Sequence, residues 1–483
     1  MKISLPTNKS RLGQFFTPGS IARFMAGLFD RSDREDCLLL DAGAGEGVLS
    51  VAFLERWLSG EFRFRRVTLD AFEIDPLLNA ALRFNLNKFQ SNESFDSTIR
   101  NVDFIHAASD WLSNDLFAAS LPAYTHAILN PPYKKIRSDS AHRSTLRRAG
   151  IETVNVYSAF VALSLSLLAD HGQLVAIIPR SFCNGPYYRP FRSFILERAA
   201  IRRIHLFDSR DKTFREDRVL QENLILVLER NGRQESVLVS TSTDGSFSDL
   251  SSYEYPFERI VIPDDPDHFI HIPTTPEDSY LQLQRNFRHS LSDLRIGVST
   301  GPVVDFRLKE YLRDMPGEDT VPLLYPSHFS GGKGRWPIPD FKKPNAILLN
   351  RKTEKLLYHN GYYCVVRRFS SKEEKRRVSA NVVDPCKFGD PSAIGFENHL
   401  NVFHDNKRGL PKALAYGIAV FLNSSIIDEH FRSFNGHTQV NVTDLKRIKY
   451  PSRSDLSSLG EWAMDRDLVS QESIDQKIET SFI

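Results

Sequence analysis

The alternation of apolar segments along the first half of the chain predicts an α/β domain. Short apolar runs that suit buried strands lie at Cys37–Leu40, Val67–Ile74, Thr125–Leu129, Leu174–Ile178, Ile204–Phe207 and Leu224–Leu228. Between these runs, apolar residues recur at helical spacing, at Ile21, Phe24, Met25 and Leu28 and at Val156, Phe160, Leu163 and Leu167. Strands that alternate with such helices are typical of a mostly parallel sheet covered by helices.

The second half of the chain has weaker periodicity and many turn-forming residues. A chain of 483 residues exceeds what one hydrophobic core usually supports, so we expect two domains. Residues 236–276 are rich in Ser, Thr, Asp and Pro, which indicates a linker or an irregular edge. We therefore predict a first domain over residues 1–235 and a second over residues 277–483.

Composition narrows the class of protein. With 41% hydrophobic and 25% charged residues and a mean hydropathy of −0.32, the chain can bury sizeable cores. No apolar run approaches the roughly 20 residues of a membrane span, and the first residues lack the apolar core of a signal peptide. We therefore expect a cytoplasmic protein without membrane contact. Four cysteines lie far apart in the sequence, so neither a disulfide framework nor a metal site is expected.

A glycine-rich turn follows the first predicted strand. In Leu38-Leu-Leu-Asp-Ala-Gly-Ala-Gly-Glu-Gly47 the glycines at 43, 45 and 47 allow the backbone to approach a ligand at the carboxyl end of the strand. The dinucleotide fingerprint would require a third glycine at position 48, which is Val48. The turn thus favours a nucleoside-like ligand other than NAD, the structural alternative being a tight connection between strand and helix.

An acidic residue follows the next strand. Glu73 in Phe72-Glu-Ile-Asp75 would lie at the neighbouring strand tip, where a carboxylate can accept hydrogen bonds from both hydroxyls of a ribose. Without the glycine turn, a solvated carboxylate at a strand end would be an equally good interpretation.

Asn130-Pro-Pro-Tyr133, after the strand Thr125–Leu129, is the most specific motif. The side-chain carbonyl of Asn130 and the backbone carbonyl of Pro131 could hold both hydrogens of an aromatic amine and stabilise positive charge on its nitrogen. Pro131 and Pro132 stiffen the loop, and Tyr133 could stack on a base, which is worth roughly 1–3 kcal/mol. The alternative is a proline-rich loop with a surface tyrosine.

Taken in order, four segments resemble the gamma-class DNA adenine-N6 methyltransferases of type II restriction-modification systems. These segments are Gly13-Gln-Phe-Phe-Thr-Pro18, Asp41–Gly47, Glu73 and Asn130–Tyr133. The resemblance covers residues 13 to about 230 and implies a Rossmann-like catalytic domain that uses S-adenosyl-L-methionine, followed by a mixed α/β target-recognition domain. It also implies methyl transfer to the N6 amine of a flipped-out adenine in double-stranded DNA.

The same resemblance implies roles for single residues. It places Phe15, Phe16, Thr17, Asp41, Ala42, Gly43, Gly45, Glu73, Ile74, Asp103 and Phe104 at the cofactor. Thr17 with Pro18 would alternatively cap a helix over Ile21–Leu28. Asp110 competes with Asp103 for contact with the cofactor's adenine; we favour Asp103 because it would end a strand beside Phe104.

For catalysis the resemblance implies Asn130, Pro131, Pro132 and Tyr133, with Phe214 as a second aromatic against the flipped base. A core or hairpin role explains Phe214 almost as well.

The second half carries groups suited to nucleic acid. Between Arg351 and Val378 there are nine Lys or Arg, interspersed with tyrosines and Phe369, which favours phosphate contacts. Four polar residues, Asn435, His437, Gln439 and Asn441, could read base edges, although such side chains more often complete polar turns.

The expected partners are double-stranded DNA, on which the protein would act as a monomer, and a separate cognate restriction endonuclease. RNA adenine or protein glutamine is the alternative substrate. A nuclease site at Pro339-Asp340 and Glu373–Lys375 is disfavoured because its second half is a charged, loop-like run.

Overall fold

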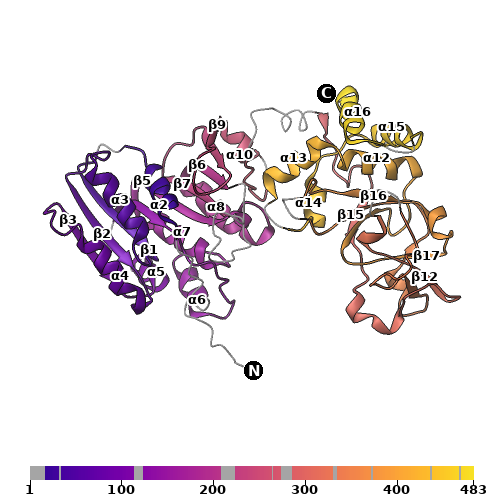
Figure 1. The fold of residues 1–483 in the computed structure, drawn as a ribbon, viewed down its shortest axis with the longest axis horizontal. Coiled ribbons are helices and arrows are strands. Elements are labelled where there is room, and N and C mark those ends of the chain that lie inside the picture. Colours follow the sequence, from indigo (N-terminus) through magenta and orange to yellow (C-terminus); the bar gives the residue numbers. More distant parts are fainter. Residues whose placement is uncertain are drawn as a thin grey trace. The chain divides into compact units, whose positions relative to one another are not determined.

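The computed structural model describes residues 17–31, 34–113, 123–207, 223–263, 265–273, 286–329, 334–370, 374–435, 438–466 and 469–482. The chain divides into two compact units, Met1–Pro276 and Glu277–Ile483, whose elements are labelled in Figure 1. No helix in the described ranges is long and apolar enough to cross a membrane.

A nine-stranded sheet forms the centre of the first unit, in the order β3-β2-β1-β4-β5-β7-β6-β8-β9. Its strands are β1 (Asp36–Ala42), β2 (Arg66–Phe72), β3 (Phe95–Arg100), β4 (Tyr124–Leu129), β5 (Leu168–Pro179), β6 (Ala199–Phe207), β7 (Asn223–Arg230), β8 (Val237–Ser242) and β9 (Ser251–Tyr255). Strands β3 to β5 in this order pair in parallel, whereas β7 runs antiparallel to β5 and β6. The predicted mostly parallel, Rossmann-like sheet is confirmed.

Helices cover both faces of this sheet. They are α2 (Gly19–Gly27), α3 (Val48–Leu58), α4 (Pro76–Asn87), α5 (Phe104–Ser113), α6 (Ala141–Arg148), α7 (Val156–Leu167), α8 (Arg189–Arg198) and the short α10 (Phe257–Ile260). Apolar residues of α2, α3 and α4 join one core, and those of α5, α7 and α8 join a second core on the opposite sheet face. Parallel strands buried on both faces explain the continuous apolar runs in the sequence.

The structure adds detail at two edges of this sheet. Strand β3, Phe95-Asp-Ser-Thr-Ile-Arg100, has no apolar run because it lies at the edge of the sheet and only Phe95 is buried. For residues 236–276 the sequence leaves a linker and an irregular edge open. Within this segment β8 runs parallel to β6 and β9 runs antiparallel to β8, so the segment forms the other edge of the sheet in the first unit.

The second unit is mixed α/β, as predicted. One sheet has the order β10 (Gly297–Thr300), β18 (Leu400–His404), β15 (Tyr363–Arg367) and β16 (Ala380–Val383). The other has the order β11 (Leu312–Arg313), β13 (Ala346–Leu348), β12 (Thr320–Leu324), β17 (Ala393–Phe396) and β14 (Tyr358–His359). The helices are α12 (Lys412–Leu422), α13 (Ser425–Phe434), α14 (Val442–Arg447), α15 (Arg453–Met464) and α16 (Gln471–Phe482).

Helices α12 and α15 approach each other so closely that only glycine fits at their crossing. A Cβ atom on Gly417 would lie 1.7 Å from the carbonyl oxygen of Leu456, and one on Gly460 would lie 1.7 Å from that of Ala413. Either substitution would force the two helices apart.

Candidate active site

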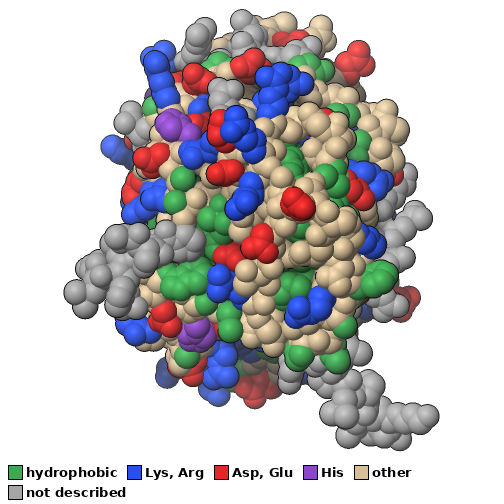
Figure 2. All heavy atoms as spheres, turned by 90° about the vertical axis from the view of Figure 1, so that its left-hand side faces the viewer, with side chains coloured by type: hydrophobic (Ala, Val, Ile, Leu, Met, Phe, Trp, Pro, Cys, Tyr) green, Lys and Arg blue, Asp and Glu red, His purple; other side chains and the backbone are tan. Residues whose placement is uncertain are grey.

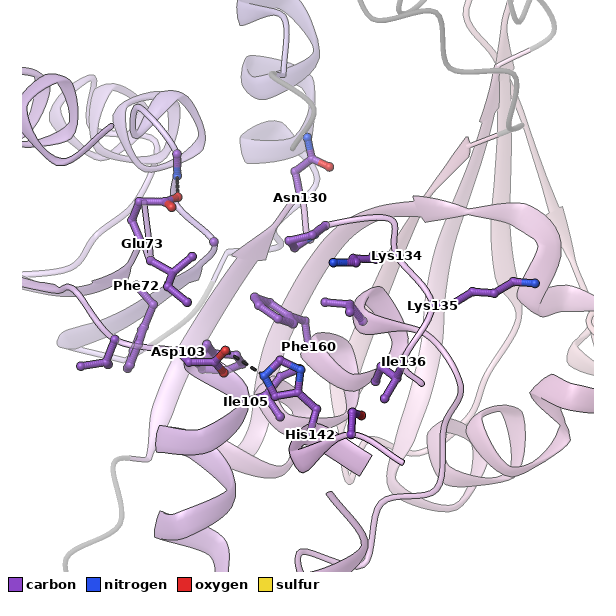
Figure 3. Close-up of a pocket in the computed structure, with 18 of the residues that line it drawn as sticks. Phe72, Glu73, Asp103, Ile105, Asn130, Lys134, Lys135, Ile136, His142 and Phe160 are labelled. Carbon is purple, nitrogen blue, oxygen red and sulfur yellow. Dashed lines mark hydrogen bonds and ion pairs between the residues drawn. The ribbon is translucent and has the colours of Figure 1, made fainter. Parts of the chain in front are cut away.

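A cavity of about 280 Å³ lies at the carboxyl ends of β1, β2 and β4. Its wall contains Gly43 and Gly45 after β1, Glu73 and Ile74 after β2, Asp103 and Phe104 at the start of α5, Asn130 and Pro132 after β4, and Val156 and Phe160 of α7. Figure 3 shows several of these side chains converging from different elements. Open α/β sheets bind ligands in such a crevice.

The glycine turn has the backbone conformation that the sequence suggested. Gly43, Gly45 and Gly47 have φ of 81°, 58° and 83°, in the left-handed region that favours glycine. A Cβ on Gly45 would meet nothing within 4 Å, whereas one on Gly47 would lie 2.6 Å from Leu82 Cδ1. Gly45 therefore leaves open space above the turn, and Gly47 allows α3 to pack on α4.

Asp41 and Ala42 lie behind this turn and are not on the cavity wall. Both are fully buried, and Ser50 Oγ on α3 donates a hydrogen bond of 2.6 Å to Asp41 Oδ2. Burial, with the nearby charge of Glu73, raises the pKa of Asp41 to about 7 against the opposing effect of Ser50. Among the predicted cofactor residues, Asp41 therefore holds the turn to the helix behind it.

Both carboxylate oxygens of Glu73 accept a hydrogen bond from a backbone amide, which fixes the side chain. Its side chain is only 4% exposed; the Gly45 amide donates to Oε2 at 2.8 Å, and the Asp75 amide donates to Oε1 at 2.7 Å. Burial raises the pKa of Glu73 despite these amides. Each carboxylate oxygen has a second lone pair, so the group can still accept hydrogen bonds from a ligand.

Of the two candidate aspartates, the structure places Asp103, not Asp110, at the cavity. Asp103 lies on the cavity wall, immediately before α5. Asp110, on α5, is absent from that wall, has a side chain that is 61% exposed, and forms a loose ion pair of 3.9 Å with Arg148. Of these two aspartates, Asp103 is therefore the one available to a ligand in this cavity.

An aromatic residue that the sequence indicated only as helix core completes the apolar wall. The ring centroids of Phe104 and Phe160 lie 5.1 Å apart, and both residues line the cavity with Ile74 and Pro132. Helical spacing predicts Phe160 on a buried face of α7, and its exposure of 8% is consistent with that role. Its second role could not be recognised from helical spacing, because a helix face gives no information about the neighbouring loop.

Asn130 has its amide oriented from two sides. Its Nδ2 donates to Thr17 Oγ1 at 2.9 Å, and the hydroxyl of Tyr133 lies 3.2 Å from both Asn130 Oδ1 and the carbonyl oxygen of Ile177. The predicted capping role of Thr17 is wrong, because Pro18 is the N-cap residue of α2 and no side chain caps it. The Thr17 hydroxyl instead accepts from Asn130, whose side chain points away from His142 and Ile136 in Figure 3.

Not every residue of the motif reaches the cavity. Pro132 and Asn130 line it, whereas Pro131 and Tyr133 do not. The Tyr133 ring packs edge-on against Tyr157, with centroids 6.3 Å apart, and burial raises the pKa of its hydroxyl. The predictions for Phe15, Phe16 and Phe214 lie outside the described residues.

One cluster at the cavity was not anticipated. Asp103, His106 and His142 bring potential ligand atoms within 4.8 Å of one another, the one such group of three in the described ranges. His142 Nε2 lies 2.9 Å from Asp103 Oδ2. Two atoms that share a tetrahedral zinc ion at about 2.0–2.1 Å are roughly 3.3 Å apart, so this contact is a hydrogen bond. We therefore describe the cluster as a hydrogen-bonded one.

Lysine and arginine side chains are interspersed with Asp and Glu on the face of the molecule in Figure 2, in agreement with a formal net charge of only +2.

The predicted basic segment of the second unit is also less uniform than its sequence. Arg377 is 1% exposed, and two tyrosines of the same segment, Tyr358 and Tyr363, are 2% and 0% exposed. Arg351, Lys352 and Lys355 are exposed.

The polar residues near the end of the chain form an internal network. Asn435 is 1% exposed; its Oδ1 accepts from Arg377 Nη2 at 3.0 Å and its Nδ2 donates to Asp444 Oδ2 at 3.0 Å. Asn441 forms a capping box with Asp444 at the start of α14. These two asparagines complete turns, Gln439 is half-buried, and His437 lies outside the described residues.

Comparison with known proteins identifies the family. The Eco57I restriction-modification methylase family matches residues 50–214. The type II methyltransferase M.BsuBI of Bacillus subtilis is 54% identical over 98% of this chain and 94% of that protein. M.PstI of Providencia stuartii, also a type II methyltransferase, is 40% identical over 98% of this chain and 94% of its own length.

A solved structure shares the fold. The DrdV–DNA complex superposes with a TM-score of 0.51 at 11% identity, covering 94% of this chain and 57% of the DrdV chain. The similarity to two type II methyltransferases over nearly the full length of the chain bears out the resemblance drawn from the motifs. The chain belongs to the type II methyltransferases of restriction-modification systems.

Proposed function

We propose that the protein is a site-specific DNA methyltransferase that transfers a methyl group from S-adenosyl-L-methionine to the N6 amine of a flipped-out adenine. The modification would protect host DNA from a cognate restriction endonuclease. The observation that carries the proposal is the position of Asn130-Pro-Pro-Tyr133 at the end of β4, beside a cavity lined by two carboxylates and an aromatic pair.

The acceptor and aromatic side chains of the cavity fit the cofactor. Glu73, fixed by two backbone amides, would accept from the ribose hydroxyls, and Asp103 would accept from the adenine amine. Phe104 and Phe160 would enclose the adenine ring together with Ile74. The bound cofactor supplies a methyl group on a positively charged sulfur, which is already electrophilic. The chain therefore has to orient the amine rather than activate the methyl group.

Asn130 is suited to that task. An adenine amine is a poor nucleophile because its lone pair is delocalised into the ring. If Asn130 Oδ1 and the Pro131 carbonyl accept its two hydrogens, the nitrogen can become pyramidal, so that its lone pair is localised toward the methyl group, and the charge that develops on nitrogen is stabilised. Thr17 holds the amide so that Oδ1, not Nδ2, is presented. No strong base is required.

The remaining roles belong to residues that lie off the cavity wall or outside the described residues. Tyr133 would stack on the flipped base, with Phe214 on its other face. Phe15 and Phe16 would contact the cofactor next to Thr17, and Asp41 and Ala42 would act through the position of the glycine turn.

We assign target recognition to the second unit, with residues 1–235 as the catalytic domain and 277–483 as the recognition domain. Arg351, Lys352 and Lys355, which are exposed, would position the duplex by phosphate contacts. The protein would act as a monomer on double-stranded DNA, and the endonuclease would be a separate chain. We propose a cytoplasmic location, where the DNA is.

The test is transfer of labelled methyl groups from S-adenosyl-L-methionine to unmethylated plasmid DNA, followed by nucleoside analysis and sequencing of the modified sites. N6-methyladenine confined to one short sequence is expected. Parallel reactions with total RNA and with protein substrates provide the contrast. Label in either of these but not in DNA would overturn the substrate, and N4-methylcytosine in the DNA would overturn the target base.

A further inference from the structure

The carboxylate of Asp103 is held by groups from two helices. The amide of His106 on α5 donates to Oδ1 at 3.1 Å, and His142 Nε2 on α6 lies 2.9 Å from Oδ2. Asp103 and His142 both line the cavity, and Figure 3 shows the two side chains facing each other across its lower part. The Asp103 and His142 side chains are 26% and 34% exposed, so a ligand can reach the pair.

Both partners of this pair are biased toward their charged forms. Burial alone would raise the pKa of Asp103, but the hydrogen bond and charge of His142, aided by the His106 amide, outweigh it and lower the pKa. The bond to Asp103 raises the pKa of His142 against burial and against the positive charge of Lys134. Among the described residues, the imidazole of His106 also faces His142, with ring centroids 4.9 Å apart.

We propose that His142 is a positioning residue, which fixes Asp103 as an ionised acceptor for the 6-amino group of the cofactor's adenine and makes cofactor binding tighter when His142 is protonated. The inference rests on the proposed function, because it takes the cofactor to be an adenosine derivative.

The geometry explains why His142 should affect selectivity as well as affinity. Each oxygen of Asp103 accepts from one donor among the described residues, which leaves lone pairs for the amine. An ionised acceptor attracts an amino group but repels the carbonyl oxygen of a 6-oxopurine. Without His142, Asp103 would rotate more freely and take up a proton more readily, and a protonated carboxyl can donate to a 6-oxo group.

His142 also connects the cavity with the motif that precedes it. Its helix, α6, follows Tyr133 after a short loop in which Lys134, Lys135 and Ile136 line the same cavity. Sequence patterns gave no signal for this residue, because a lone histidine near a helix start has no characteristic spacing. Only the fold brings it to Asp103, 39 positions earlier.

Binding of S-adenosylhomocysteine and S-inosylhomocysteine to the full chain tests the inference. Dissociation constants are measured by calorimetry between pH 5.5 and 8.5 for the wild type, His142→Gln and His142→Ala. Protonation of His142 strengthens its hydrogen bond to Asp103, because charge then lies on both donor and acceptor. The carboxylate is then held more firmly in its accepting position, so we expect wild-type affinity for S-adenosylhomocysteine to fall about 3–10-fold as His142 loses its proton. The curve of His142→Gln should be flat over this range.

Selectivity separates positioning from a purely structural role. Gln can still donate to Asp103, so His142→Gln should keep a larger preference for the 6-amino over the 6-oxo ligand than His142→Ala. Thermal unfolding verifies that both variants are folded. By linkage, binding of S-adenosylhomocysteine to the wild type should raise the pKa of the His142 imidazole, which NMR titration measures directly.

The outcomes are distinct. If the wild type binds S-adenosylhomocysteine with the same pH dependence and selectivity as folded His142→Ala, or if binding leaves the pKa of His142 unchanged, the role of His142 is refuted while the cofactor site stands. If the wild type binds S-adenosylhomocysteine at no pH, the proposed function fails and this inference fails with it. If a chelator abolishes the pH dependence, the cluster acts through a metal ion and the inference is overturned.

Discussion

Asn130 in the first unit and Asn435 in the second both have their amides fixed by hydrogen bonds, but in different surroundings. Asn130 is half-buried beside a cavity and is held by Thr17 and Tyr133. Asn435 is 1% exposed and connects Arg377 to Asp444 inside the unit. The first arrangement presents an oriented polar group to a ligand, whereas the second satisfies polar groups that burial has removed from water.

This difference shows how a polar motif is to be judged. Its residue types do not separate a ligand-binding asparagine from a turn-completing one, because both use the same amide. What separates them is whether the carbonyl lies next to an open cavity. Substitution of the two asparagines should therefore have different signatures, a loss of turnover for Asn130 and a loss of stability for Asn435.

The largest effect should come from Asn130→Ala. Removing an acceptor that stabilises developing charge typically costs about 10²–10³-fold in turnover, and we expect at least that loss in single-turnover methyl transfer. Cofactor affinity should stay within roughly twofold, because Asn130 is assigned to the amine. Loss of cofactor binding with normal turnover of the bound complex would contradict the assignment.

Glu73→Gln should weaken cofactor binding by about 10–100-fold, the range for a hydrogen bond to a charged group. In either orientation of the new amide, its NH₂ group would also face one of the two backbone donors, the amide of Gly45 or that of Asp75. Equilibrium binding of S-adenosylhomocysteine measures the change. Turnover at saturating cofactor should change much less, and a variant with normal affinity would remove Glu73 from the site.

In the second unit, Asn435→Ala should lower the free energy of unfolding by about 1–3 kcal/mol, because it leaves Arg377 and Asp444 buried with one partner fewer. Denaturant unfolding gives the value. The methylated sequence should be unchanged in the folded fraction. An altered recognition sequence at unaltered stability would mean that Asn435 reads bases after all.

Thr17→Val tests whether Asn130 needs its fixed orientation. The exchange keeps the shape of the side chain and removes the hydroxyl that accepts from Asn130 Nδ2. One neutral hydrogen bond is worth about 0.5–1.5 kcal/mol, so turnover should fall roughly 3–10-fold. Cofactor affinity is measured in parallel. A loss confined to affinity would indicate that Thr17 acts on the cofactor instead.

The smallest effect is expected for Arg351→Ala, at an exposed position of the second unit. Loss of one phosphate contact should weaken binding to all DNA sequences about equally and reduce the slope of log affinity against log salt by about 1. Filter binding at several salt concentrations gives the slope. Arg377→Ala, which removes a buried side chain, should instead destabilise the unit.

The sequence by itself determined the fold class and the central strands of the first unit, although not the edge strands β3, β8 and β9. Runs of apolar residues fixed the central strands, and the glycine turn, Glu73 and Asn130 followed strand ends that a parallel sheet brings to one edge. Such features depend on local pattern and on the geometry common to parallel sheets. Similarity to type II methyltransferases over nearly the full length of the chain confirmed the family that these motifs indicated.

Only the tertiary structure decided which polar groups meet. It assigned the cavity to Asp103 rather than Asp110 and paired Asp103 with His142. It turned Thr17 from a helix cap into a partner of Asn130, 113 positions later in the chain. It also buried Arg377, one of the cations of the basic segment. The physical reason is that a hydrogen bond requires two groups within about 3 Å, and sequence spacing does not specify that distance between residues on different elements.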